Sequence, residues 1–516
     1  MACQHWLPLT IFKPNKSMNK NFLMTVLALA TSLNLQAEVK LPALLSDNMV
    51  LQQQSDARFW GWADPGEKVE VQGSWAKESS KPVTADKDGK WQLALKTPKA
   101  GGPYTITVKG NNTIDLKNIL IGEVWVCSGQ SNMEFRLPHA TNGKQEVAEA
   151  NYPQIRFLNV SGAATAHPAD DVKGQWSECT PKTAGGILAV PYFFGRKIHT
   201  ELNVPIGLVC PAMGATPARA WTSGKMLLEK NMYANEVKLV SDPETIEKAK
   251  AKYEAEMVTW QEAADKAKAE GTPEPRRPRG LPSIGSRWPS ALFNGMISPL
   301  TSSTIKGVIW YQGENDVSGL GWYKPLFPNL IQSWRDAWGL GDFPFYHVQL
   351  PPYDYRHSNS ALFREVQMQS LSIKNVGIAV TLDVGDFKNI HPSHKKEVGE
   401  RLALWALAKE YGKKDVVFSG PIYKDMKIEG KKIRLSFDHT DSPMVAKDGT
   451  LTNFVIAGAD KKFVPAKAKI ENNTIVVSSD KVAKPVAVRY AFDNAGVPSL
   501  FNKEGLPASS FRTDEW

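Results

Sequence analysis

The pattern of apolar and polar positions divides the chain into regions of different periodicity. From about residue 39 to 118, apolar and polar side chains alternate, as in segments 68–73 and 104–109. A period of two is typical of half-buried strands, and turn sequences such as Asp64-Pro65-Gly66 separate these segments. The pattern predicts a small antiparallel β domain over residues 38–118.

The pattern changes at about residue 119, where short continuous apolar segments begin to alternate with helical stretches. Segments 206–210, 307–310 and 377–381 have the composition of buried parallel strands. Segment 395–411 has helical periodicity. This alternation predicts an α/β fold with a parallel sheet over residues 119–412. The Ala-, Lys- and Glu-rich stretch within 225–285 is predicted to be a solvated helical insertion.

From about residue 416 the period of two returns, as in segments 432–437 and 474–477. We therefore expect a second β region over residues 413–516, either as a separate domain or joined to the first.

The first 37 residues have the features of an export signal. They contain Lys13, Lys16 and Lys20 but no Asp or Glu, and an apolar run follows at 22–30. This run is too short to span a bilayer, and small residues ending at Ala37 follow it. The sequence predicts cleavage after Ala37 and an exported protein, either periplasmic or secreted.

Composition and cysteine spacing argue against a nucleic-acid-binding protein and against a zinc site. The formal charge is +9, but no run of Lys and Arg with interleaved aromatic residues is present, which argues against nucleic-acid binding. Cys3, Cys127, Cys179 and Cys210 form no Cys-x-x-Cys pair or zinc spacing. Cys3 is expected to lie outside the mature protein, and the other three are expected to be buried free thiols. No metal, cofactor or membrane span is predicted, and the sequence leaves the oligomeric state open.

The strongest chemical signal lies at 122–133, where an apolar strand runs into a glycine-containing turn and then Ser131. Such a turn can present a hydroxyl at the carboxyl end of a parallel sheet, where ligands of α/β folds bind. Gly129 allows the backbone to turn tightly. The Gly-x-Ser-x-Gly elbow of α/β-hydrolases is absent.

The segment Gly129-Gln130-Ser131-Asn132-Met133 resembles the nucleophile block of the sialate O-acetylesterase family, within the SGNH hydrolase superfamily. Further blocks in family order are 47–52, 60–63, 189–195, 289–297, 310–314 and 390–403, the last with His391 and Lys395. The resemblance extends across nearly the whole mature chain. It implies an SGNH-type α/β/α sandwich flanked by β regions, and an esterase acting on O-acetylated sugars.

The resemblance also implies roles for single residues. Ser131 matches the nucleophile, which forms an acyl-serine intermediate, and His391 matches the general base. The oxyanion hole would combine the backbone N–H groups of Ser131 and Gly214 with the side chain of Asn315. Many relatives have Gly-Gly-Thr at positions 214–216, and many differ around position 315, so Gln312 is an alternative to Asn315.

One departure concerns the acid that orients the histidine. The superfamily usually has Asp three residues before the His, but here that position is Lys388. Asp386 is the preferred substitute and Asp383 a second, while a Ser–His dyad oriented by a backbone carbonyl is an equal alternative.

Trp221, Tyr311 and Arg219 lie close in sequence to catalytic blocks and are predicted to shape the substrate pocket. The resemblance implies O-acetylated sialic acid as substrate. Acetylated xylan or another plant or host glycan is the alternative, because a fold does not fix the sugar. A glycan-binding protein with an inactive hydrolase core is the rival hypothesis.

Overall fold

The computed structural model describes residues 38–280, 283–356 and 358–516, so the predicted export signal lies outside the described residues. Its centre is a sheet in the order β13-β12-β11-β7-β10-β8-β9. All neighbours along this path are parallel except β8 and β9. The strands are β7 (Thr113–Gly129), β8 (Tyr152–Asn159), β9 (Trp176–Cys179), β10 (Ile206–Cys210), β11 (Gly307–Tyr311), β12 (Phe345–Val348) and β13 (Val376–Ala379).

Helices cover both faces of this sheet, which explains its continuous apolar strands. Trp125 of β7 packs on the side of α4 (Ala189–Leu202) and α10 (Lys395–Lys409), with its ring 5.0 Å from that of Phe194. Val126 belongs to the opposite core, on the side of α8 (Leu320–Trp338). Short helix α3 (Gly143–Glu149) and α9 (Ser360–Gln369) complete the layers, so the predicted α/β/α sandwich is confirmed.

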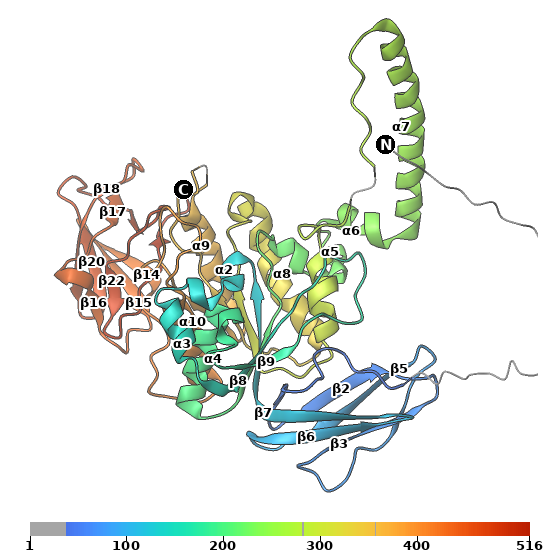
Figure 1. The fold of residues 1–516 in the computed structure, drawn as a ribbon. Coiled ribbons are helices and arrows are strands. Elements are labelled where there is room, and N and C mark those ends of the chain that lie inside the picture. Colours follow the sequence, from blue (N-terminus) through green and yellow to red (C-terminus); the bar gives the residue numbers. More distant parts are fainter. Residues whose placement is uncertain (1–37, 281–282, 357) are drawn as a thin grey trace, which may run out of the picture.

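Strand β7 also belongs to the N-terminal β region (Figure 1). Its first half pairs antiparallel with β6, and residues 120–122 pair with β1. Its second half enters the central sheet, so the strand passes through the predicted domain boundary at 118/119. The other strands of this region are β1 (Val50–Gln52), β2 (Asp56–Trp62), β3 (Lys68–Gly73), β4 (Val83–Thr84), β5 (Lys90–Lys96) and β6 (Gly101–Lys109).

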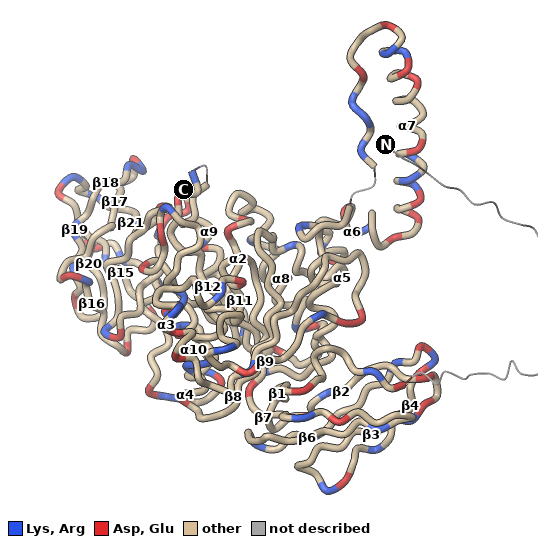
Figure 2. Tube along the Cα trace, viewed as in Figure 1, with Lys and Arg blue, Asp and Glu red and all other residues tan. Residues whose placement is uncertain are grey.

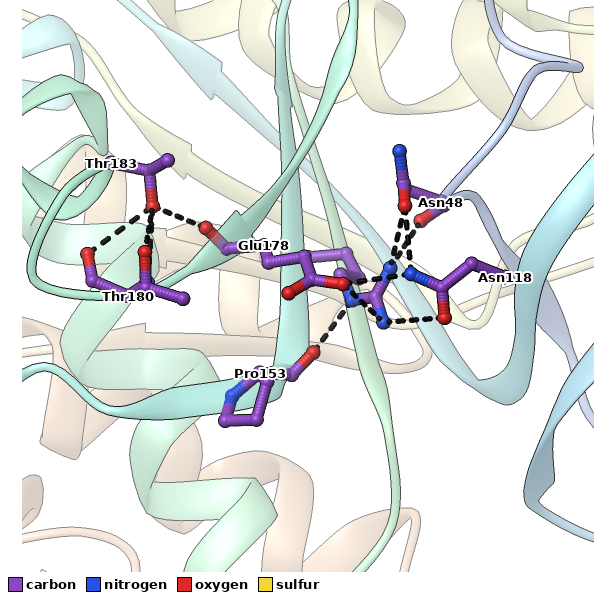
Figure 3. A network of polar contacts seen from close by, with 7 residues as sticks. Asn48, Asn118, Pro153, Glu178, Thr180 and Thr183 are labelled. Atoms are coloured by element: carbon purple, nitrogen blue, oxygen red, sulfur yellow. Dashed lines mark hydrogen bonds and ion pairs between the residues drawn. The ribbon is translucent and has the colours of Figure 1, made fainter.

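A buried arginine reinforces this junction. Arg156 of β8 is 3% exposed and lies 3.2 Å from the Glu178 carboxylate of β9. It also donates to the carbonyl of Asn48 and to Oδ1 of Asn118, at 3.3 Å each. Figure 3 shows Asn118 at the centre of this group: its Nδ2 donates to Glu178 Oε1 at 2.7 Å and to Asn48 Oδ1 at 2.8 Å. A polar network thus fixes the N-terminal β region against the central sheet.

The predicted insertion consists of α5 (Gly224–Glu229), α6 (Ala234–Ser241) and α7 (Pro243–Glu270). Helix α7 begins after the N-cap Asp242 and ends at Gly271, which has φ 66°. It projects away from the sheet (Figure 1), and the returning segment is held by a 2.9 Å hydrogen bond from Trp260 Nε1 to the Pro275 carbonyl. Lys, Arg, Asp and Glu are interleaved along it (Figure 2), as expected for a solvated helix.

The C-terminal region is antiparallel β-structure with its own core, as predicted. Fully buried Arg364 of α9 joins it to the central domain by donating to Ser510 Oγ at 3.0 Å and to the Asp493 carbonyl at 2.5 Å. The strands are β14 (Ile422–Glu429), β15 (Lys432–Asp438), β16 (Met444–Ala446), β17 (Phe454–Ala457), β18 (Val464–Pro465), β19 (Lys467–Glu471), β20 (Thr474–Ser478), β21 (Ala487–Tyr490), β22 (Leu500–Asn502) and β23 (Phe511–Arg512).

Cys127, Cys179 and Cys210 are buried free thiols, as the sequence predicted. Among the described residues, no helix has the length and apolar character needed to span a membrane.

Candidate active site

The strand-to-helix turn after β7 positions Ser131. Gly129 has φ 142°, and a Cβ atom there would lie 2.1 Å from the Tyr311 carbonyl oxygen, so no larger residue fits. Ser131 is the first residue of the short helix α2 (Ser131–Glu134). Its backbone N–H is therefore one of those that helix geometry leaves without an intrahelical acceptor.

The loop between β13 and α10 brings His391 to the same place. His391 Nε2 lies 2.8 Å from Ser131 Oγ, and both side chains are partly exposed. The loop is held locally, because the His391 backbone N–H donates to Asn389 Oδ1 at 3.0 Å. Two residues 260 positions apart thus form the hydrogen bond that a nucleophile and its base require.

Burial of the imidazole lowers the pKa of His391, and the nearby Lys395 ammonium lowers it further. His391 is therefore neutral at pH 7, as a base that accepts the Ser131 proton must be.

The predicted role of Asp386 as orienter is not supported. Its Oδ1 accepts from the Lys388 backbone N–H at 2.9 Å, which shapes the loop. Asp383 is paired with Arg401 at 2.6 Å. Within the described residues, His391 Nδ1 makes no hydrogen bond with a carboxylate or a carbonyl. Loop curvature therefore does not bring either aspartate to the imidazole, and the geometry is that of a dyad.

The oxyanion-hole candidates Gly214 and Asn315 lie together beside Ser131. A Cβ atom on Gly214 would be 3.4 Å from Ser131 Cβ. The Gly214 N–H donates to Glu134 Oε2 at 2.7 Å. An oxyanion therefore has to compete with the Glu134 carboxylate for this N–H. Asn315 Nδ2 donates to the Ala215 carbonyl at 3.2 Å and has a second N–H free to donate.

Three predicted site residues lie instead in the core. Gln312 is 1% exposed and donates to Asp316 Oδ2 at 2.5 Å and to the Thr216 carbonyl, so it is not an oxyanion donor. Trp221 is fully buried, with Nε1 bonded to Thr216 Oγ1 at 2.9 Å, and Tyr311 is 1% exposed. The predicted substrate contacts of Trp221 and Tyr311 are therefore wrong. Closeness in sequence to a catalytic residue does not show whether a side chain is exposed to the substrate or buried beneath it.

Arg219 lies at the edge of the site with a second arginine that the sequence analysis did not single out. Arg219 is partly exposed, stacks over the Tyr233 ring at 5.3 Å and donates to the Arg287 carbonyl at 3.3 Å. Arg287 donates to Asn315 Oδ1 at 2.9 Å. Since Oδ1 faces Arg287, Nδ2 of Asn315 is directed to the other side, toward the Gly214-Ala215 turn.

Sequence reasoning also missed a buried polar group behind Ser131, made of Asn132, Glu314 and Lys395. All three belong to blocks quoted for the family resemblance. The available signal was a lysine at the start of the otherwise apolar face of 395–411. No group of three or more His, Cys, Asp or Glu in the described part of the chain could hold a metal ion.

Comparison with known proteins identifies the family of this chain. The model of the family described as "Carbohydrate esterase, sialic acid-specific acetylesterase" matches residues 121–268 and 282–408. The sialate O-acetylesterase of Mus musculus is 30% identical over 494 residues, which cover 87% of this chain and 88% of the mouse protein. The Homo sapiens enzyme is 28% identical, covering 90% and 91%.

A solved structure shows the same fold. The carbohydrate acetylesterase from Xanthomonas citri is 33% identical and has a TM-score of 0.80. The match covers 93% of this chain and all of that chain, so the similarity includes the flanking β regions.

Replacing Ala215 by glycine is expected to stabilise the protein. Ala215 has φ 56°, a left-handed conformation that costs a residue with Cβ about 1 kcal/mol. Thermal or urea unfolding of Ala215→Gly should show a gain of this size. Ala218→Gly in the neighbouring 3-10 turn is the control and should lose stability. Equal losses in both variants would contradict the assignment of strain.

Proposed function

Because the chain belongs to the carbohydrate esterase, sialic acid-specific acetylesterase family, we propose that it hydrolyses O-acetyl esters of sialic acids. The observation that carries the mechanism is the 2.8 Å contact between Ser131 Oγ and His391 Nε2. It is the contact through which an imidazole removes the proton of a serine nucleophile.

In the first half-reaction, Ser131 Oγ attacks the acetyl carbonyl while His391 Nε2 takes the hydroxyl proton. The tetrahedral intermediate collapses, the ester C–O bond breaks, and His391 returns the proton to the sugar oxygen. Water then attacks acetyl-Ser131 with its proton passing to His391. Collapse of this second intermediate releases acetate and restores the serine hydroxyl.

The negative charge on the tetrahedral intermediate requires fixed donors. We assign the Ser131 and Gly214 backbone N–H groups and Asn315 Nδ2 to this role. For this role, the Gly214 N–H has to exchange its 2.7 Å bond to the Glu134 carboxylate for a bond to the oxyanion. Arg287 supports the hole indirectly, because its bond to Asn315 Oδ1 keeps the amide in the donating orientation.

The arginines favour an acidic sugar over a neutral one. Arg219 and Arg287 donate to uncharged acceptors, the Arg287 carbonyl and Asn315 Oδ1 respectively. The nearby Asp316 carboxylate is buried and already accepts from the Ala218 N–H at 2.8 Å and from Gln312. Sialic acids carry a carboxylate that xylose units lack, and guanidinium groups bind carboxylates with strong, charge-assisted hydrogen bonds.

Ser131→Ala is expected to lower kcat/KM on p-nitrophenyl acetate at least about 1,000-fold, because the nucleophile is lost. His391→Gln should cause a comparable loss. Asp386→Asn is the control and should retain activity within about tenfold, since its carboxylate binds a loop N–H rather than the imidazole. A wild-type protein inactive on this ester and on acetylated sugars would instead favour a glycan-binding protein.

Arg219→Ala is expected to reduce kcat/KM for O-acetylated sialic acid about 10- to 100-fold more than for p-nitrophenyl acetate, the loss typical of a charged hydrogen bond. Acetate release from acetylated sialic acids and acetylated xylooligosaccharides, followed by mass spectrometry, measures the ratio. Arg277→Ala on the projecting arm, where Arg277 stacks on Trp260, is the matched control. An unchanged ratio, or preference for the xylooligosaccharides, would contradict an acidic substrate.

We also propose that the protein is exported and processed after Ala37. Amino-terminal sequencing of the mature protein from its native host should find Glu38 as the first residue. A protein that retains residues 1–37 would contradict this proposal.

A further inference from the structure

A lysine lies buried behind the Ser131–His391 pair, and the hydrolytic mechanism above does not use it. Lys395 is fully buried, and its Nζ donates to Asn132 Oδ1 at 2.5 Å. The ammonium also lies 4.8 Å from the Phe135 ring centroid and 5.1 Å from that of Tyr311. Burial lowers the pKa of Lys395 to about 7. Desolvating an ammonium is costly, so a specific set of contacts has to offset it.

The Asn132 amide connects the two catalytic loops. A lysine ammonium only donates, so the oxygen of the amide faces Lys395 and the nitrogen faces the other way. Asn132 Nδ2 donates to the Ile390 carbonyl at 2.9 Å and to Glu314 Oε1. Asn132 directly follows Ser131 in sequence, and Ile390 directly precedes His391. One side chain therefore links the backbone next to the nucleophile with the backbone next to the base.

Glu314 completes the buried group on the other side of the Asn132 amide. Its Oε2 is buried and makes no hydrogen bond within the described residues. Burial raises the pKa of Glu314, and the Lys395 ammonium opposes this rise. The amide of Asn132 thus bridges the buried Lys395 and Glu314 side chains, and both contacts restrict its orientation.

We propose that Lys395, acting through Asn132, is the positioning residue that replaces the missing acid in orienting His391. The inference rests on the proposed esterase function. In a Ser–His–Asp triad the acid binds the far side of the imidazole and stabilises its charged form. Here the His391 loop is held through its backbone instead, by the bond from Asn132 to the Ile390 carbonyl.

With a lysine in place of an acid, the charge that acts on His391 has the opposite sign. The titratable groups that face the catalytic pair from behind are Lys395, Tyr311 and, beyond the amide, Glu314. Tyr311 is neutral because burial raises the pKa of its hydroxyl, and Lys395 is the charged group that acts on His391. An ammonium near the imidazole disfavours the imidazolium. His391 therefore remains a neutral base at a lower pH than it would beside an aspartate.

The test is the pH dependence of kcat/KM on p-nitrophenyl acetate, measured between pH 4.5 and 8 with the full mature chain. Lys395→Met should move the acid limb upward by roughly half a pH unit, as expected for the loss of one charge several ångströms away. Lys395→Arg keeps the charge and should leave the limb in place. Lys396→Met removes the same charge from the adjacent, exposed position and should change neither the limb nor kcat.

Asn132→Asp provides an isosteric second variant, in case Lys395→Met does not fold. It loses the donation to the Ile390 carbonyl, so kcat should fall about 10- to 100-fold with little change in KM. A wild-type limb in folded Lys395→Met, or full kcat in folded Asn132→Asp, would overturn the inference while leaving the esterase function intact. An inactive wild-type protein would overturn the function itself.

Discussion

The chemistry of this molecule depends on one hydrogen bond between Ser131 Oγ and His391 Nε2. The two residues are 260 positions apart in the sequence of the catalytic domain. The parallel topology of the sheet brings them together. Strand β7 is central in the sheet and β13 lies at its edge, but both end on the same side. The residues that follow parallel strands gather at that edge, which is where α/β folds bind ligands. The side chains around this bond then decide how strong a base the imidazole is.

The residues around His391 differ from those of a Ser–His–Asp triad, in which an acid binds the imidazole. The loop before α10 has its aspartates occupied elsewhere, with Asp386 on a backbone N–H and Asp383 on Arg401. What replaces them is a buried amide with a lysine behind it. A base that is weakened by a cation is favourable where the surroundings are mildly acidic, because it is less readily protonated there.

Much of the fold followed from periodicity, because each β region exposes one face and the central strands expose neither. The roles of Ser131 and His391 followed from the resemblance of their blocks to a known family. The errors share a physical cause. Trp221, Tyr311 and Gln312 stand close to catalytic residues in sequence, but all three are buried in the interior, because closeness along the chain does not determine which way a side chain points. Arg287 joins the site only because the insertion returns beside it, which no local pattern indicates.

The continuity of β7 has a mechanical consequence. The same strand is hydrogen-bonded to β6 in the N-terminal β region and to β10 and β11 in the catalytic sheet, and Arg156 fixes the junction laterally. The N-terminal region therefore has no hinge about which it can swing, and a chain begun at residue 119 would expose an unpaired strand edge leading straight to the nucleophile. This β region is a structural extension of the active-site strand rather than an accessory module attached by a linker.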